Sequence, residues 1–506
     1  MTRLENRVGV SPKSGAIWAV AVAYAVVIGL VAAVGQSWTA FVMVATVLAV
    51  AAYYASALGL QVGLMLMLTV SAMIDHFTIR FGPVDLRAEE IAGVIVLLAF
   101  GFWRLRDRDM SWLRPNRGEL LLGAWLVWGI LSSVIDSPDR RLSAKYALLY
   151  GVCILGFLLP RRLLAGKGAP ERLETLIRWL LIIFATEAIY GSVGYLLHVL
   201  GPTIAISPNP ASGHLESFGT LWEPNVFGSM CAAGAVAWVY FGPSRFRNAW
   251  VGLALCMSGL IDSLTRAAWL AAAVIGGLGY AVPSLRRRLD LVMAGWGLLA
   301  GMLAAGAVLV VDAVGSYTVP VPHVGVAPPP QHTGVFGALL NMTDFIGRIN
   351  QGGAVWSDIH GNILFGRGLG SFLVLHQDPP GTPEHVASLP LLILNDTGIV
   401  GLILFAAFVV TIFLRAWKRR RHPLVVGLSQ VALVLAVANL ATQTTELMIG
   451  WLLIGILIAA TELAPAEEST KAAPARGLAP DRVCHRRLAH RRGLRAIRLL
   501  DQIRTR

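Results

Sequence analysis

Long apolar runs, separated by short polar stretches, recur along nearly the whole chain. Most are about 17 to 25 residues long, the length an α-helix needs to cross the roughly 30 Å hydrocarbon core of a membrane. They are continuously apolar, whereas the strands of a membrane barrel alternate apolar and polar residues over about ten positions. The pattern therefore predicts an all-α fold, a polytopic integral membrane protein.

The runs predict about 12 to 14 transmembrane helices and one long extracytoplasmic loop. The second and third runs are alternatively one re-entrant unit. The expected spans lie near residues 15–34, 37–57, 58–74, 90–104, 118–135, 143–160, 175–200, 225–242, 248–263, 266–283, 289–312, 389–414, 424–442 and 446–463. The expected domains are a transmembrane helical domain over 1–463, an extracytoplasmic loop subdomain within it over 313–388, and a basic cytoplasmic tail over 464–506.

Composition agrees with a membrane protein, since 56% of the residues are hydrophobic, 14% are charged and the mean hydropathy is +0.66. The net charge of +13 does not indicate a nucleic-acid partner, because Lys and Arg gather in short loops between apolar runs and in the tail. With the N-terminus inside, the positive-inside rule predicts a protein of a bacterial-type cell (inner or plasma) membrane whose two termini are both cytoplasmic. The same placement makes these basic loops cytoplasmic: RLRDRDMSWLRPNR, PRRLLAGKGAPER, GPSRFRN, PSLRRRL and RAWKRRRHP.

The opposite side carries the elaborate loops. Residues 201–225 contain no Lys or Arg, and residues 313–388 form a long segment rich in Pro and Gly. We expect its first part to be disordered and its second part to be functional, because loops of this length are usually one or the other.

Familiar cofactor and metal motifs are absent from the sequence. It contains no P-loop, no dinucleotide fingerprint, no HExxH and no paired CxxC, and its four cysteines do not suggest a disulfide framework. We therefore expect no cofactor and no metal.

Two arginines on the expected outer face are candidates for binding a diphosphate. Arg266 stands at the outer end of a span and Arg348 in the long loop, both against the positive-inside tendency. A guanidinium offers a planar fork of donors that fits phosphate oxygens in two-point contact. For Arg266, an interfacial side chain reaching toward lipid headgroups is the alternative.

The same face carries candidates for acid–base chemistry and sugar binding. His385 and His360 are the candidate general bases, because a histidine titrates near neutrality. Glu223 and Asn225, at the start of a span, are candidates for binding the acceptor or its sugar hydroxyls, and a simple helix start at Pro224 is the alternative. Glu187 falls near the middle of a span, where a carboxylate suggests a proton relay or a partner for a buried cation.

In these segments the sequence resembles the O-antigen ligase and O-antigen polymerase superfamily of bacterial polysaccharide assembly. The resemblance covers roughly residues 217–402. It rests on the order of GTLWEPN, SLTRAAWL, RINQGGAVW, LFGRGLGSF and SLPLLILNDTGIVGL.

The resemblance implies an all-helical membrane glycosyltransferase that uses no nucleotide sugar. Such an enzyme transfers a glycan from an undecaprenyl diphosphate carrier to an acceptor hydroxyl of a glycan or glycolipid, with inversion. It further implies that Arg266 and Arg348 engage the diphosphate and that a histidine near the end of the loop activates the acceptor. Ligase and polymerase activities both remain open.

Other functions stay possible at this point. A polysaccharide or lipid transporter is favoured by the number of spans and by Glu187. A polyprenyl-phosphate-dependent mannosyltransferase would use acidic residues of an early outer segment, where Asp75, Asp85, Glu89 and Glu90 lie. A non-catalytic subunit of an envelope assembly complex is the third alternative.

Overall fold

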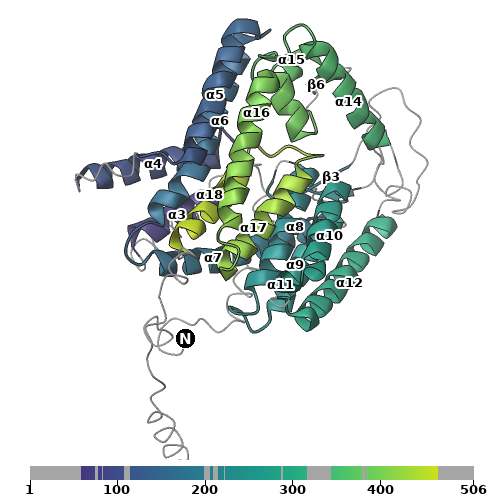
Figure 1. Ribbon diagram of the computed structural model, residues 1–506. Helices are drawn as coiled ribbons and strands as arrows, with labels where there is room; N and C mark the ends of the chain where they lie inside the picture. Colours follow the sequence, from purple (N-terminus) through teal and green to yellow (C-terminus); the bar gives the residue numbers. More distant parts are fainter. Residues whose placement is uncertain are drawn as a thin grey trace, which may run out of the picture. The chain divides into compact units, whose positions relative to one another are not determined.

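A computed structural model of the chain describes eleven stretches of the sequence (Figure 1). These are residues 59–74, 78–81, 84–106, 114–198, 205–208, 215–221, 223–286, 289–315, 343–378, 382–383 and 386–464. The chain divides into two units, Met1–Ala464 and Pro465–Arg506. The second unit, which contains the expected basic tail, and the spans expected near 15–34 and 37–57 lie outside the described residues.

The described residues are mostly helical, and each apolar run expected from residue 58 onward forms a helix. Their ends differ from the expected ones by a few residues. The helices are α3 (Leu60–Ser71), α4 (Ala88–Arg106), α5 (Arg117–Asp136), α6 (Arg140–Leu163), α7 (Ala169–His198), α8 (Pro224–Phe241), α9 (Ala249–Asp262), α10 (Arg266–Ala281), α11 (Pro283–Arg286), α12 (Leu291–Gly315), α14 (Thr343–Ile359), α15 (Phe372–Leu375), α16 (Leu389–Trp417), α17 (Pro423–Ala438) and α18 (Met448–Leu463).

Strands in the described residues form three short antiparallel pairs, each within one loop. The pairs are β1 (Thr78–Phe81) with β2 (Val84–Arg87), β3 (Ile206–Pro208) with β4 (Leu215–Ser217), and β5 (Gln377–Asp378) with β6 (Thr382–Pro383). All three connect helices rather than forming a core sheet.

Four of the helices, α5, α6, α7 and α16, are long and apolar enough to cross a membrane, judged by length and composition. Helices α3, α9, α10, α17 and α18 are apolar but have 10 to 17 residues each. They are shorter than the expected spans of about 20 residues. The chain leaves the helical conformation early at these points, in the turn at 263–265 and in the segment 439–447.

Helix α18 lies at the centre of the core. Most of its residues are buried, and it packs along α6 (Figure 1). A Cβ on Gly455 would lie 2.6 Å from the backbone oxygen of Phe157, and one on Gly156 would lie 2.9 Å from the backbone oxygen of Met448. Only glycine allows two helices to approach this closely, as at the small-residue contacts of membrane helices.

Charged side chains join four helix ends on one side of the bundle. Glu119, at the start of α5, receives both Nη atoms of Arg162, at 2.9 and 3.0 Å, and Arg161 Nη1 at 3.2 Å. Glu462, near the end of α18, receives Arg161 Nε and Arg415 Nη2, each at 2.8 Å. We call this cluster of five residues the ion-paired end; it gathers the start of α5 and the ends of α6, α16 and α18.

Three of the five basic loops expected in the cytoplasm contribute residues to this end or contact it. Arg161 and Arg162 belong to PRRLLAGKGAPER, and Arg415 belongs to RAWKRRRHP. Arg161 Nη1 also donates to the backbone oxygen of Arg114 at 3.3 Å. Arg114 belongs to another basic loop, RLRDRDMSWLRPNR. Described residues of three basic loops, far apart in the sequence, thus lie close together.

Helix α16 is broken at Gly398, where φ is 63° and ψ is −168°, a conformation that essentially only glycine adopts. Residues 363–371 bond to the backbone groups freed by the break. The N–H groups of Arg367 and Gly368 donate to the backbone oxygens of Asn395 and Asp396 at 2.7 and 3.0 Å. Non-helical backbone inside apolar surroundings persists where protein groups satisfy it.

The glycines of LFGRGLGSF make this contact possible. Gly366, Gly368 and Gly370 all have positive φ. A Cβ on Gly366 would lie 2.5 Å from the backbone nitrogen of Gly398. The segment therefore fits the break as bare backbone against backbone.

Candidate functional site

The segments GTLWEPN and SLTRAAWL meet at one corner of the bundle. Helix α8 begins after Glu223, and α10 begins at Arg266, directly after Thr265. Thr265 Oγ1 donates to the backbone oxygen of Pro224 at 2.9 Å, and Asn225 Nδ2 donates to Glu223 Oε1. The structure thus brings the sequence-predicted Glu223, Asn225 and Arg266 into one neighbourhood.

The turn that precedes Arg266 is strained. Leu264 has a φ of 50°, which is rare for a residue with a branched, bulky side chain. Ser263 Oγ donates to the backbone oxygen of Leu260 at 2.7 Å and closes the last turn of α9. Strained backbone of this kind is often kept where it positions a functional group, and here the next helix opens with Arg266.

Two buried carboxyl groups hold this corner from beneath. Asp262 Oδ2 accepts hydrogen bonds from Ser192 Oγ at 2.6 Å and from Ser258 Oγ at 3.3 Å, which ties α9 to α7. Glu187, in α7, lies 2.6 Å from both the backbone nitrogen and Oγ1 of Thr220. Asp262 lies four positions before Arg266 in the sequence, and Thr220, which Glu187 holds, lies three positions before Glu223.

The structure gives Glu187 a hydrogen-bonding partner that the sequence did not indicate. The carboxyl group pairs with Thr220 of GTLWEPN, and the proton relay and the buried cation stay predictions. A Cβ on Gly219 would lie 2.1 Å from Glu187 Oε1, so only glycine fits beside it. Glu187 fastens the segment before α8 onto α7.

Arg348, in α14, contacts a segment that links several parts of the same side of the molecule. We call residues 439–447, between α17 and α18, the hub segment. Arg348 Nη1 donates to the backbone oxygen of Ala441, in this segment. Arg87 Nη1 donates to the backbone oxygen of Glu446 at 3.0 Å, and the N–H of Leu389 donates to the oxygen of Asn439 at 3.0 Å.

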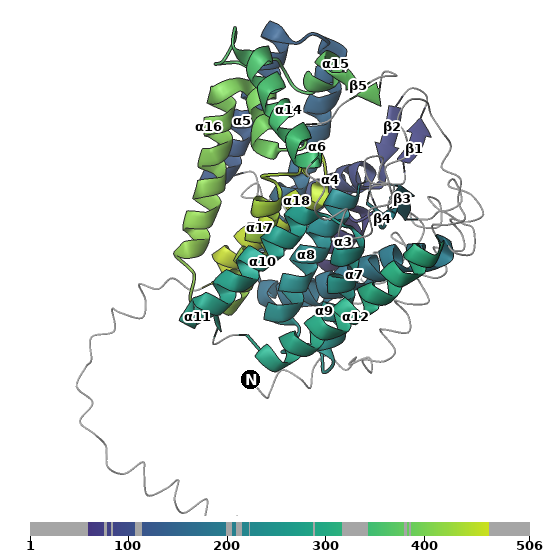
Figure 2. The same cartoon turned by 90° about the vertical axis from the view of Figure 1, so that its right-hand side faces the viewer.

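Arg266 and Arg348 belong to the same end of the bundle, opposite the ion-paired end. Helix α17 starts shortly after Arg415 and ends at Ala438, three residues before Ala441. Helix α10 packs along α17 and runs toward α11, which lies at the far end from the hub segment (Figure 2). Arg266, the first residue of α10, therefore shares the hub end with Arg348.

The two candidate bases are placed differently. His385 lies outside the described residues. His360 is exposed just after α14, with its ring Nδ1 2.9 Å from the backbone oxygen of Ser357. At 1.5 Å per helical residue, about 18 Å of α14 separates His360 from Arg348. The structure does not bring these two together.

A histidine–carboxylate pair that the sequence analysis missed lies on the same side. His376 Nε2 is 2.7 Å from Asp358 Oδ2, and the ring packs on Phe372 at a centroid distance of 4.3 Å. Both side chains are partly exposed, at 27% and 16%. A carboxylate that fixes the orientation of an accessible imidazole is an arrangement suited to general-base work. Eighteen residues separate the pair, and no local pattern joins them.

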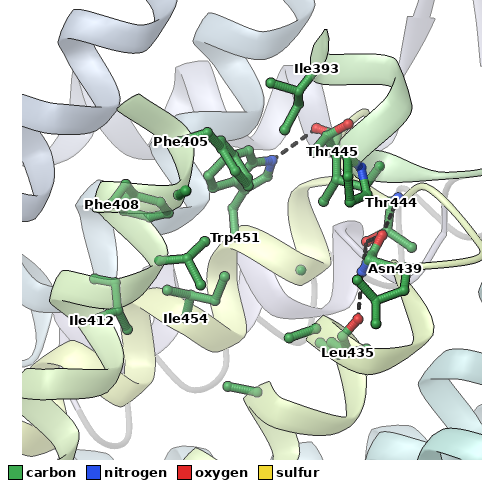
Figure 3. A pocket seen from close by; sticks show the side chains of 18 of the residues that line it. Ile393, Phe405, Phe408, Ile412, Leu435, Asn439, Thr444, Thr445, Trp451 and Ile454 are labelled. Atoms are coloured by element: carbon green, nitrogen blue, oxygen red, sulfur yellow. Dashed lines mark hydrogen bonds between the residues drawn. The ribbon is translucent and has the colours of Figure 1, made fainter. Parts of the chain in front are cut away.

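An apolar pocket of about 360 Å³ lies between α16 and the pair α17 and α18 (Figure 3). Its walls are mainly aromatic and aliphatic, and its polar lining comes from the hub segment. Representative lining residues are Phe405, Phe408, Ile412, Leu435, Trp451 and Ile454.

Within the described part of the chain, no group of three or more His, Cys, Asp or Glu side chains is arranged to hold a metal ion. No protein-family model matches the chain, and no curated protein matches it significantly.

Proposed function

We propose that the chain is a polytopic membrane protein that acts as a glycosyltransferase on the extracytoplasmic face of a bacterial-type cell membrane. The membrane assignment is supported by α5, α6, α7 and α16, which are long and apolar enough to span. The orientation is supported by the gathering of three basic loops at the ion-paired end, which the positive-inside rule makes cytoplasmic. The hub end then faces outward.

The proposed reaction transfers a glycan from an undecaprenyl diphosphate-type carrier to a sugar hydroxyl of an acceptor glycan or glycolipid. The observation that carries it is the placement of Arg266 and Arg348 at the same end of α10 and α17. Guanidinium groups bind phosphate oxygens in two-point contact, and they stabilise the charge that grows on a diphosphate leaving group.

The chemical step needs a base and a binding surface for the acceptor. The acceptor oxygen forms a new bond to the anomeric carbon while the bond from that carbon to the diphosphate oxygen breaks. The base takes the hydroxyl proton, the diphosphate keeps the bonding electrons, and the configuration inverts. His385 and His360 remain the proposed bases from the sequence, the pair of His376 and Asp358 is a third, and Glu223 with Asn225 is proposed to bind the acceptor.

The test replaces Arg266 and Arg348 singly with Ala and with Lys in cells that depend on the chain. Each Ala variant is expected to lower transfer about 100-fold or more, since losing one electrostatic contact to developing charge costs on that order. Carrier-linked glycan should then accumulate. The Lys variants should keep part of the activity, because they retain the charge but not the fork.

Arg178 supplies the matched control, because it is exposed and pairs with Glu174 one helical turn away. R178A should transfer glycan as the unchanged protein does. Normal transfer by R266A and R348A, in variants that reach the membrane at normal levels, would refute the proposal.

A polysaccharide or lipid transporter is the second candidate function. The break of α16 at Gly398 favours it, because interrupted helices form the substrate sites of many transporters. Movement of a labelled carrier-linked glycan across vesicles without formation of a glycosidic bond would support this candidate over the transferase.

A further inference from the structure

The carboxylate of Glu223 stands at the start of α8 but does not cap the helix. Glu223 is the residue just before α8, and its backbone oxygen accepts the N–H groups of Val226 and Phe227 at 3.1 and 3.0 Å. Its side chain accepts none of the N–H groups of the first turn. A carboxylate at this position ordinarily does so, because those groups have no partner inside the helix. The helix start therefore uses the backbone of Glu223 and leaves its charge for another purpose.

A neighbouring amide orients this carboxylate. Asn225 Nδ2 donates to Glu223 Oε1. Among the described residues, no cation pairs with the carboxylate and no other group donates to it, and the side chain is partly exposed. An ionised carboxylate accepts hydrogen bonds at both oxygens. Oε2 is thus the oxygen that can meet the hydroxyl group of a ligand.

The start of α8 is fixed against the turn that precedes Arg266. Thr265 Oγ1 donates to the backbone oxygen of Pro224 at 2.9 Å, and a Cβ on Gly228 would lie 2.8 Å from that of Thr265. Glu223 and Arg266 are the chain neighbours of Pro224 and Thr265. One step of about 3.8 Å between Cα atoms therefore separates each of them from this contact.

The described histidines lie farther from a proposed diphosphate contact. His360 and His376 stand at the opposite end of α14 from Arg348, about 15 to 18 Å away along the helix. In an inverting displacement the base and the leaving group flank one sugar ring, and the paired carboxyl groups of inverting glycosidases are about 6.5 to 9.5 Å apart. The separation along α14 is about twice that spacing, whereas Glu223 and Arg266 adjoin one contact.

We propose, on the basis of the proposed function, that Glu223 is the general base of the transfer. Oε2 takes the proton of the acceptor hydroxyl while Asn225 holds Oε1. The acceptor oxygen bonds to the anomeric carbon, the bond from that carbon to the diphosphate breaks, and the diphosphate leaves with the electron pair beside Arg266. The acceptor-binding role of Glu223 thereby becomes a catalytic one.

The test supplies a nucleophile that has no proton to remove. The purified full chain is reconstituted into vesicles of membrane lipids from cells that lack it, which supply the accumulated carrier-linked glycan and the acceptor. Sodium azide is then added. Azide bonds to the anomeric carbon through nitrogen as the diphosphate leaves, and the product is a glycosyl azide of inverted configuration. Azide can replace a missing base, but it cannot replace a missing contact to the diphosphate.

E223A and E223Q should each lower transfer to the acceptor hydroxyl about 100-fold or more, the usual contribution of a general base. Azide should restore turnover of the carrier-linked glycan in both variants. R266A should stay inactive with azide, because it lacks a group that stabilises the leaving diphosphate. E171Q, at an exposed carboxylate of the basic loop PRRLLAGKGAPER, is the matched control and should transfer as the unchanged chain does.

Normal transfer by E223Q would overturn the base assignment. A loss without azide rescue in E223Q would overturn it too, because this variant keeps the size of the side chain and an oxygen for Asn225, so Glu223 would then only bind the acceptor. Azide rescue of H360A, H376A or H385A would give the role to that histidine instead. Failure of the unchanged chain to transfer glycan would overturn the proposed function itself, so the two failures are distinguishable.

Discussion

The ion-paired end and the hub end of the bundle are held together by different interactions. At the ion-paired end, side chains of opposite charge bind one another, as Glu119 does with Arg161 and Arg162. At the hub end, backbone oxygens of the hub segment accept hydrogen bonds from Arg348 at Ala441 and from Arg87 at Glu446, and Arg87 also pairs with Glu89 at 4.0 Å.

The two ends also differ in the regularity of their backbone. At the ion-paired end, three arginines pair with two glutamates across the helix ends. At the hub end, α16 is unwound, α9 turns sharply into α10, and polar side chains such as Glu187 hold irregular segments in place. Irregular backbone concentrates where a protein binds or reacts with a ligand, so the contrast favours the hub end as the functional one.

The largest expected effect comes from the break in α16. In G398A the new Cβ would lie 2.4 Å from the backbone oxygen of Leu364, at a φ that only glycine adopts freely. Both sides of the clash are backbone, so we expect a loss of about 5 kcal/mol or more of stability. Thermal denaturation in detergent measures it. G123A, on an open face of α5, should be neutral, and a G398A protein as stable as G123A would show that the break is not needed.

A smaller but still large effect is expected at the ion-paired end. E119A leaves Arg162 without its carboxylate and leaves Arg161 with Glu462 alone, in a site where Glu119 is 8% exposed. Removing one partner of a buried ion pair costs about 3 to 5 kcal/mol. The melting temperature should fall, while glycan transfer per folded molecule should stay unchanged. Loss of transfer without loss of stability would contradict the division between the two ends.

The smallest expected effect on stability concerns Glu187. Thr220 Oγ1 contacts both Met73 O and Glu187 Oε2, and one hydroxyl proton cannot serve two acceptors. The carboxyl group is therefore expected to carry a proton. E187Q offers the same donor and acceptor and should change stability by less than about 1 kcal/mol, whereas E187A should cost about 2 kcal/mol by stranding Thr220.

Activity assays of these variants decide between an anchor and a relay. If Glu187 only holds Thr220 in place, E187Q keeps glycan transfer. If Glu187 relays a proton in a transporter, E187Q loses transport, because an amide cannot exchange the proton. Abolished function in a fully stable E187Q would end the anchoring interpretation and strengthen the transporter candidate.

The amino-acid sequence by itself determined the helical fold and the helix positions. Apolar runs of suitable length must bury their backbone polar groups, so they form helices wherever they occur, and every run described here did so. It also predicted that the basic loops share one side, and the contacts of Arg161 and Arg415 bring described residues of three of these loops together. These properties follow from composition along the chain and need no knowledge of contacts.

Only the tertiary structure decided how distant segments meet. Nothing local to LFGRGLGSF indicates that it packs against the break of α16 at Gly398. The reason is that its backbone N–H groups bond to backbone oxygens some thirty residues away. Other contacts of the site also join distant segments: His376 with Asp358, Glu187 with Thr220, and Arg348 with Ala441. Each depends on the distance between two groups in space, and the order of residues along a chain does not specify that distance until the helices pack.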